Sequence, residues 1–363
     1  MTNLLRVENL SVCYESRGGR VTALDKVNVD IRSNELLAVV GESGCGKSTL
    51  ALAIIGLLPN PPARVLNGEI EFKGTNLVQL QPARMREYRG TQIAMIFQEP
   101  LSSLNPVYKV GDQIAEAIIV KKSREDGHAV ETEFMQKTHK VTLPSKVPKR
   151  PRSGKRISAE LKQEIIASLK LVRIPDPEQV IDRYPFELSG GMRQRIMIAM
   201  ALSQEPALLV ADEPTTALDV TTQAQVLKLM RELMEKVKTS ILLITHDLAV
   251  ACQVADRVAV MYAGDVVEAA NVFELFSKPL HPYTEGLLSC LPTGSKHKVD
   301  LRPIPGSVPD LRSPLVACKY ASRCPHVMKK CTEKKPDLIE IREKHEVACY
   351  LHGEKNGTDT ANN

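Results

Sequence analysis

One nine-residue segment constrains the fold of this chain more than any other feature. The sequence GESGCGKST at 41–49 matches the phosphate-binding pattern G-x-x-x-x-G-K-S/T, and the apolar run LLAVV at 36–40 comes directly before it. A short apolar run predicts a buried strand, and a loop of this pattern leads into the amino terminus of a helix. The sequence therefore predicts an α/β fold in which a strand, a phosphate loop and a helix follow one another.

The residues of this loop are suited to a nucleoside triphosphate. Its glycines let backbone N–H groups turn toward phosphates, Lys47 is expected to neutralise β- and γ-phosphate oxygens, and the Ser48 hydroxyl is expected to ligate Mg²⁺. Taken alone, the segment also fits a glycine-rich turn before an ordinary helix. The predicted ATP-binding residues of the loop are Gly41, Glu42, Ser43, Gly44, Cys45, Gly46, Lys47, Ser48 and Thr49.

Two adjacent acids follow a second apolar run, LLVA at 208–211. Open α/β sheets bind ligands at the carboxyl ends of their strands, which is where Asp212 and Glu213 are expected to lie. We expect Asp212 to bind Mg²⁺ through water and Glu213 to polarise an attacking water. Without the phosphate loop upstream, the same acid pair would suit a solvated strand end.

The segment LSGGMRQR at 188–195 lies shortly before this strand and resembles the signature sequence of ATP-binding-cassette (ABC) ATPases. The resemblance covers about residues 4–265. It implies that Tyr14 stacks on adenine, that Gln98 links Mg²⁺ and water to a partner-facing loop, and that His246 senses the γ-phosphate. It also implies that Asp219 lies in a loop across a dimer interface. The catalytic set implied in this way is Glu213, His246, Gln98 and Lys47, with Ser48, Gln98 and Asp212 around Mg²⁺.

In that family the signature acts on a nucleotide held by a second cassette, because two cassettes meet head to tail. Ser189, Gly190 and Gly191, together with Gln194, are therefore expected to face the γ-phosphate on a partner, and a lone chain is expected to be weakly active or inactive. A hydroxyl and two glycine N–H groups before a helix at 192–202 would form an anion-binding terminus. By themselves they also fit an N-capped helix.

Apolar and charged segments limit the classes of function. The amino terminus MTNLLRVENL lacks a secretory signal pattern, and no apolar run approaches the ~20 residues of a spanning helix. Residues 121–156 hold eleven Lys or Arg against four Asp or Glu, a local net charge of +7. Because the whole chain has a formal net charge of +5, the remaining residues sum to −2. We therefore expect a soluble subunit that does not bind nucleic acid. Any membrane part must be another chain.

The order of elements predicts several structural units. Residues 4–31 read as a hairpin that carries Tyr14, and 68–74 as a further strand of that sheet. Core strands are expected at 93–97, 207–211, 240–244 and 258–262, and helices at 110–120 and 159–172. The predicted fold is a P-loop NTPase cassette at 1–265 with a mostly parallel core sheet, an antiparallel β subdomain and a helical subdomain at about 99–187. Its basic insertion spans about 121–156, and within it 141–156 is expected to be a disordered solvated loop or, alternatively, a contact for anionic lipid.

The segments at 278–292, 303–311 and 98–114 resemble those of ABC ATPases from di- and oligopeptide importers. The resemblance implies a carboxyl-terminal extension at 266–363 and an ATPase subunit at the cytoplasmic face of the cell membrane. Its implied partners are two integral membrane permeases, a second and different ABC ATPase subunit and, indirectly, an extracytoplasmic substrate-binding protein. Import of oligosaccharides is the alternative, and a soluble ABC ATPase outside transport is a more distant one.

The eight cysteines fall into two groups. The first group is Cys318, Cys324, Cys331 and Cys349. Four thiolates suffice for one [4Fe–4S] cluster, and the resemblance implies one, because some members of the importer group carry a cluster at such a set. The absence of C-x₂-C pairs makes zinc less favoured, although zinc or no metal stays open. Cys13, Cys252 and Cys290 are expected to be core residues. Cys45 is expected to have a lowered thiol pKa because it precedes a helix.

Overall fold

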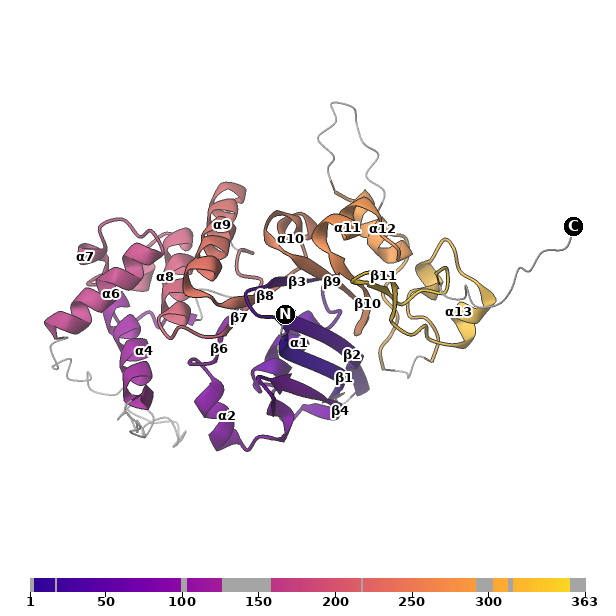
Figure 1. Cartoon of the computed structure of the whole chain (residues 1–363), viewed down its shortest axis with the longest axis horizontal. Coiled ribbons are helices and arrows are strands. Elements are labelled where there is room, and N and C mark those ends of the chain that lie inside the picture. Colours follow the sequence, from indigo (N-terminus) through magenta and orange to yellow (C-terminus); the bar gives the residue numbers. More distant parts are fainter. Residues whose placement is uncertain are drawn as a thin grey trace, which may run out of the picture.

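An eight-stranded sheet forms the core and carries the phosphate loop after one of its inner strands (Figure 1). The computed structural model describes residues 3–16, 18–98, 103–125, 158–216, 218–291, 303–312 and 316–352. Five neighbouring strands are parallel and almost wholly buried, which explains their uninterrupted apolar sequences. In spatial order they are β9 (Arg257–Tyr262), β3 (Leu36–Val40), β8 (Ser240–Thr245), β7 (Leu208–Asp212) and β6 (Ile93–Ile96).

A second, antiparallel sheet packs on one side of this core. Its order is β2 (Gly19–Arg32), β1 (Asn3–Ser16), β4 (Ala63–Phe72) and β5 (Thr75–Asn76). The predicted hairpin and the further strand are confirmed, and Tyr14 lies in β1 opposite Val21 and Ala63. Helix α1 (Lys47–Ile54) buries Leu50 and Ile54 between the two sheets, so the phosphate loop leads into the middle of the molecule.

Helices cover the opposite side of the core sheet. A single apolar core joins that face of the sheet to the helices at one end of the molecule (Figure 1). The helices and turns at that end are α4 (Val110–Glu125), α6 (Ala159–Leu171), α7 (Pro177–Val180), η2 (Pro185–Glu187), α8 (Gly190–Leu202) and α9 (Val220–Val237). Helix α10 (Leu248–Val254) covers the same face of the sheet beside β3 and β8. The predicted helices at 110–120, 159–172 and 192–202 are confirmed. Most of the basic insertion, including 141–156, lies outside the described residues.

The carboxyl-terminal extension continues the core sheet on its other edge. Strand β10 (Asp265–Asn271) runs antiparallel to β9, and β12 (His345–Val347) and β11 (Ile339–Arg342) extend the sheet beyond it. Between them lie α11 (Val272–Ser277), α12 (Pro282–Ser289), η3 (Ala321–Arg323) and α13 (Lys329–Glu333). Two short elements, η1 (Leu77–Gln79) and α2 (Pro82–Tyr88), follow β5.

None of the helices within the described residues is long and apolar enough to span a bilayer.

Candidate functional site

The phosphate loop approaches neighbouring backbone so closely that side chains are excluded at two of its glycines. A Cβ at Gly41 would lie 2.1 Å from the Met261 carbonyl oxygen of β9. At Gly46, where φ is +107°, it would lie 2.6 Å from the Ala23 carbonyl oxygen of β2. Both sheets therefore fix the path of the loop, and glycine is required at these positions by contact as well as by backbone angle.

Lys47 is buried, and its ammonium group lies against the loop. Its Nζ donates to the carbonyl oxygens of Gly41 at 2.8 Å and Glu42 at 3.0 Å. The side chain is thus held at the loop and not in solvent. A phosphate oxygen that replaced one carbonyl partner would receive a charged donor with little reorganisation.

Two oxygen-bearing side chains meet beside the loop. Ser48 Oγ donates to Asp212 Oδ1 at 3.2 Å, which joins the start of α1 to the end of β7. Burial and the neighbouring charge of Glu213 raise the pKa of Asp212, against the opposing effects of Ser48 and Lys47. A hydroxyl and a carboxylate are the ligands that Mg²⁺ prefers, so the donor set fits a magnesium ion.

The Glu213 carboxylate receives hydrogen bonds at both oxygens. Gln98 Nε2 donates to Oε2 at 3.0 Å, and Thr216 Oγ1 donates to the same oxygen at 2.8 Å. His246 Nδ1 lies 3.1 Å from Oε1. Burial alone would raise the pKa of Glu213, but the bonds from His246 and Thr216 outweigh it and lower the pKa. Sequence reasoning missed Thr216, although it lies only three residues beyond the acid.

Tyr14 lies at the other end of the loop. Its hydroxyl is 3.3 Å from Thr49 Oγ1 in α1. The first antiparallel strand therefore brings an aromatic side chain beside the residues that follow the phosphate-binding turn.

The signature residues line a separate open cavity of about 430 Å³. Ser189 caps α8 by accepting from the Met192 N–H at 3.3 Å, and Asp219 caps α9 by accepting from the Thr222 N–H at 2.9 Å. The two capped helices lie together at the helical end of the molecule (Figure 1). The cavity is lined by Ser189, Gly190, Gly191, Met192, Asp219, Thr222, Leu218, Gln225, Pro175, Arg173 and Arg195.

Gln194 does not line this cavity. Its side chain is buried, and within the described residues neither of its amide atoms has a hydrogen-bond partner. The structure therefore separates Gln194 from the three signature residues with which the sequence grouped it.

The extension contacts the phosphate loop through Glu42. Arg323 donates to both oxygens of the Glu42 carboxylate, at 2.9 and 3.0 Å, and the Glu42 N–H donates to the Tyr283 hydroxyl at 3.0 Å. The side chain of Glu42 is thus directed at the extension, which sequence reasoning did not anticipate.

Four cysteines of the extension line one small pocket together with His281 and His326. Burial, together with the neighbouring cysteines, raises the pKa of the Cys349 thiol to about 11. Within the described ranges, no group of three or more His, Cys, Asp or Glu side chains is arranged to hold a single metal ion. The lining cysteines are Cys318, Cys324, Cys331 and Cys349.

Three expectations for the remaining cysteines were wrong, and one is confirmed. Cys13 is buried as expected, whereas Cys252 and Cys290 are exposed. Burial raises the pKa of the Cys45 thiol, against the opposing effect of Lys47, instead of lowering it. The thiol lies under the loop with 2% of the residue exposed, so desolvation outweighs the helix terminus.

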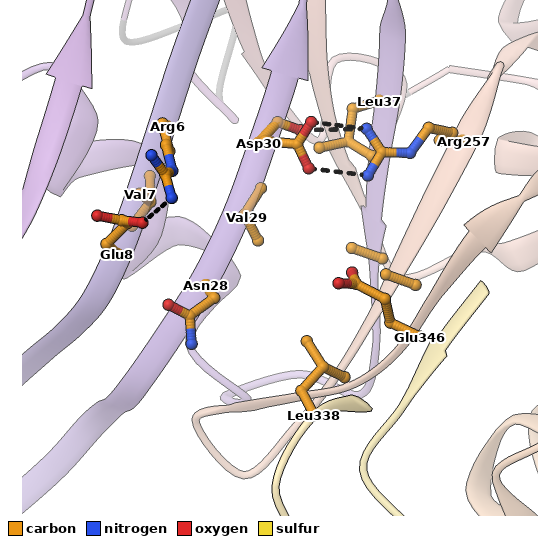
Figure 2. A pocket seen from close by; sticks show the side chains of 12 residues that line it. Arg6, Val7, Glu8, Asn28, Val29, Asp30, Leu37, Arg257, Leu338 and Glu346 are labelled. Atoms are coloured by element: carbon orange, nitrogen blue, oxygen red, sulfur yellow. Dashed lines mark hydrogen bonds and ion pairs between the residues drawn. The ribbon is translucent and has the colours of Figure 1, made fainter. Parts of the chain in front are cut away.

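A further cavity, of about 170 Å³, lies between the two sheets and β12 (Figure 2). Its charged walls are largely paired among themselves: Arg6 pairs with Glu8, and Arg257 Nη2 lies 3.0 Å from Asp30 Oδ1. None of the predicted nucleotide-binding residues lines it.

Comparison with known proteins places this site in a family. Residues 24–216 match the ABC transporter family, and residues 267–331 match the family described as oligopeptide/dipeptide transporter, C-terminal region. A dipeptide transport ATP-binding protein, DppD, of Bacillus subtilis is 43% identical over 98% of this chain and 96% of its own length. An oligopeptide transport ATP-binding protein, OppD, of the same organism is 45% identical over 97% of this chain and 89% of its own length.

Solved structures share the cassette fold. The protein cbiO1 of Clostridium perfringens, part of the ABC transporter complex cbiONQ, is 26% identical, covers 77% of this chain and 92% of its own, and gives a TM-score of 0.57. A dimeric ATP-binding cassette in a post-hydrolysis state with ADP and phosphate is 24% identical over 74% of this chain, also with a TM-score of 0.57. The predicted P-loop NTPase fold is thereby confirmed.

A phosphate loop, an acid pair, a signature helix and a matching carboxyl-terminal region thus occur together, and the chain belongs to the ABC transporter ATP-binding subunits, which are ATPases coupled to transport.

Proposed function

We propose that this chain hydrolyses ATP to power the import of di- or oligopeptides through a binding-protein-dependent transporter. The observation that carries the proposal is the match of residues 267–331 to the oligopeptide/dipeptide transporter region behind a complete nucleotide site. The relatives DppD and OppD, which align over almost the whole chain, are named for dipeptide and oligopeptide transport, and this supports the same cargo class.

We propose the same domain boundaries that the sequence predicts. Residues 1–265 form the nucleotide-binding cassette, with the helical subdomain at about 99–187, and residues 266–363 form the extension. The extension is a further region of the same core sheet because β12 pairs with β10. We expect it to move with the cassette and not as an independent body.

Binding of ATP is assigned to the loop and its surroundings. Tyr14 stacks on the adenine, the loop N–H groups of 41–49 surround the phosphates, and Lys47 donates to the β- and γ-phosphate oxygens. Ser48 and Asp212, which already share a hydrogen bond, would hold Mg²⁺ with Gln98. The bound ion supplies positive charge that neutralises the phosphate oxygens.

Hydrolysis is assigned to Glu213. Its carboxylate accepts a hydrogen bond from the attacking water and takes up the proton as the water oxygen attacks the γ-phosphorus and the bond to the β-phosphate oxygen breaks. Gln98 and His246 orient the carboxylate through hydrogen bonds of 3.0 and 3.1 Å. We expect both side chains to lie beside the γ-phosphate of bound ATP. Thr216 is a positioning residue, since it touches Glu213 and not the nucleotide.

A second cassette completes each site. The open cavity around Ser189, Gly190 and Gly191 is the surface on which we place the γ-phosphate bound by the partner. Asp219 caps α9 at the edge of that cavity and belongs to the same contact. The buried Gln194 supports the signature helix from inside. We therefore expect the isolated chain to hydrolyse ATP weakly.

Docking to two membrane permeases is assigned to the helical subdomain. Val107 is 73% exposed and Phe186 is 68% exposed. The segments that carry them are neighbours, because the Val110 N–H donates to the Arg183 carbonyl oxygen at 2.9 Å. Exposed apolar side chains on adjoining segments are typical of an interaction site. This docking would hold the chain at the cytoplasmic face of the membrane, beside a second, different cassette, with the substrate-binding protein on the far side.

The four extension cysteines are proposed to hold a [4Fe–4S] cluster. Their convergence on one pocket supports this, and four thiolates are a complete ligand set. The Cys318, Cys324, Cys331 and Cys349 thiolates would hold the irons of the cluster. A bound cluster would cross-link the small extension. Iron and acid-labile sulfide analysis after anaerobic purification tests the assignment: about four of each per chain support it, and stoichiometric zinc would contradict it.

The test of the transport role is purification from native membranes. The chain is extracted gently and anaerobically, and every co-purifying protein is identified. Two multi-spanning permeases, a second cassette and a peptide-binding protein support the proposal. Ribosomal or chromosomal proteins without permeases would contradict the transport role and leave the fold intact, and an oligosaccharide-binding protein would contradict the cargo class alone.

A further inference from the structure

Arg323 is a buried arginine of the extension that makes a bidentate ion pair with the phosphate loop. Its side chain is 4% exposed, and its Nη1 and Nη2 donate to Glu42 Oε2 at 2.9 Å and Oε1 at 3.0 Å. A planar guanidinium that matches both oxygens of a carboxylate fixes orientation as well as distance. The pair joins residues 281 positions apart in the sequence.

The guanidinium is held on its other sides as well. Nε donates to the Pro305 carbonyl oxygen at 2.9 Å, and Nη1 lies 3.3 Å from the Tyr262 hydroxyl. The side chain also lies over the rings of Tyr262 and Tyr320, at 5.6 and 6.0 Å from their centres. These contacts fix the conformation of the Arg323 side chain. A shift of the extension would therefore move Glu42 as well.

Glu42 is held at three separate points. Arg323 binds its carboxylate, the Tyr283 hydroxyl accepts from its N–H at 3.0 Å, and its carbonyl oxygen accepts from Lys47 Nζ at 3.0 Å. Tyr283 is itself fully buried, with its ring centre 4.7 Å from that of Tyr262. The carboxylate and the N–H of Glu42 are therefore held by the extension, and its carbonyl oxygen is held within the phosphate loop, where it also accepts from the Cys45 N–H at 3.3 Å.

Arg323 lies in the part of the extension that also forms the cysteine-lined pocket. It closes η3, directly before Cys324, and the Arg323 N–H donates to the Tyr320 carbonyl oxygen at 2.9 Å. On the other side of η3, the Cys318 N–H donates to the Cys331 carbonyl oxygen at 2.9 Å. The arginine thus projects from the backbone frame of the cysteine pocket into the nucleotide site.

We propose that Arg323 is a positioning residue for ATP binding, which fixes Glu42 so that the phosphate loop and Lys47 keep their binding geometry, and through which the extension sets the nucleotide affinity. Tyr283 acts on the same residue from the backbone side. This inference rests on the proposed ATP site but not on any cargo. Neither residue touches the phosphates, and the effect of each passes through Glu42.

The test is a double-mutant cycle on ATP binding by the full-length purified chain. Arg323→Gln and Glu42→Gln are measured singly and together, with a fluorescent ATP analogue at fixed Mg²⁺, and Arg312→Gln serves as the control. Arg312 is an exposed arginine of the same extension whose ion pair is with Asp310. We expect each of the two single variants to weaken binding about 10-fold, and the double variant to be no weaker than the singles, because one interaction is lost in all three.

A hydrolysis readout separates positioning from chemistry. In the assembled transporter, we expect Arg323→Gln to raise the KM for ATP about 10-fold and to change kcat less than about threefold, since binding and not the reacting step is affected. Tyr283→Phe, which removes only a hydroxyl from a buried ring, should also weaken ATP binding. This second variant keeps the proposal testable if Arg323→Gln does not fold.

Three results would overturn the proposal. Wild-type ATP affinity in folded Arg323→Gln or Tyr283→Phe would contradict it, as would losses that multiply in the double variant. If Arg312→Gln weakened ATP binding as much as Arg323→Gln, the effect would come from the loss of a positive charge and not from the ion pair with Glu42. Because binding is measured without transport, failure of this inference is distinguishable from failure of the import role.

Discussion

Gln98 and Glu213 are joined by a hydrogen bond of 3.0 Å, although they lie 115 positions apart in the sequence. The bond links the segment after β6 to the end of β7, two parallel strands that are neighbours in the core sheet. His246, after β8, approaches the other oxygen of the same carboxylate. Three adjacent strands thus place their carboxyl ends around one acid, and the geometry of the reacting group follows directly from sheet order.

Substitution of Glu213 is expected to separate ATP binding from hydrolysis. Glu213→Gln keeps the shape of the side chain but removes the proton acceptor, so kcat should fall ~10²–10⁴-fold while ATP remains bound. Phosphate release and nucleotide occupancy of the assembled transporter measure the two effects. Glu235→Gln, at an exposed glutamate paired with Arg231, is the control and should hydrolyse ATP at the wild-type rate. Hydrolysis by Glu213→Gln within about twofold of wild type would contradict the assigned role.

The two signature glycines are expected to differ in their effect on stability. A Cβ at Gly191 would lie 2.6 Å from Thr222 Cγ2, whereas a Cβ at Gly190 would have its nearest neighbour, Leu218 Cδ2, at 3.6 Å. Gly191→Ala should therefore lower the free energy of unfolding by ~1–3 kcal/mol because it forces α8 away from α9. Gly190→Ala should change it by less than ~1 kcal/mol. Chemical denaturation of both variants checks this, and equal losses would refute the packing explanation.

We expect Glu268 to make the free energy of unfolding depend on pH. It is fully buried and accepts hydrogen bonds from the Leu280 N–H at 2.7 Å, the His281 N–H at 3.0 Å and His345 Nε2 at 2.7 Å. Burial alone would raise its pKa, but the hydrogen bonds from His345 and from the two backbone N–H groups outweigh burial and lower the pKa below the ordinary glutamate value of 4.5. A lowered pKa in the folded state stabilises the protein above pH 4.5, and this contribution is lost as the pH falls through the folded-state value.

The matching variant is Glu268→Gln. We expect it to lower the free energy of unfolding at pH 7 by about 3 kcal/mol, since a buried acceptor network is broken, and to flatten the loss of stability below pH 4.5. Denaturant unfolding between pH 3 and pH 7 gives both numbers. Glu274→Gln, at an exposed glutamate of α11, should reproduce the wild-type profile. An unchanged acid slope in Glu268→Gln would show that other carboxyl groups govern it.

Cys45 is expected to resist alkylation in the folded protein. Its thiol is buried, and burial raises its pKa, so a maleimide should reach it only after local opening. The exposed Cys252 and Cys290 should react at least ~10-fold faster. A time course followed by peptide mass spectrometry measures the order of labelling. Modification of Cys45 before the two exposed thiols would contradict the buried position of its side chain.

Local sequence patterns predicted the parts of the site that depend on strand ends and loop chemistry. The buried strand at 36–40 is a continuous apolar run, and the phosphate loop has required glycines, so both are readable from short segments. Gln98, Glu213 and His246 each follow such a run, and parallel strands bring their carboxyl ends to one edge. Their proximity therefore follows from the predicted sheet.

Contacts between distant segments could not be predicted in this way. The burial of Cys45 depends on the approach of Met261 and β9 to the loop, which the rule for helix termini does not include. The pairing of Glu42 with Arg323 depends on how the extension folds back onto the cassette. No periodicity or motif records either contact.

Short elements were missed for a related reason. The strands β11 and β12 have four and three residues, too few for an alternating pattern to stand out. They form because β10 offers a sheet edge, and the buried pair of His345 and Glu268 closes the contact. Their structure is thus set by tertiary context and not by local propensity.

ATP-dependent peptide uptake by the transporter reconstituted in liposomes, with the wild-type chain or with Glu213→Gln, shows whether this chain powers peptide import. We expect wild type to accumulate labelled di- or oligopeptide only when ATP is supplied on the side of this chain, and Glu213→Gln to lower uptake at least ~10-fold while still binding ATP. Peptide uptake that proceeds equally with Glu213→Gln, or wild-type ATP hydrolysis that no peptide and binding protein stimulate, would contradict the import role.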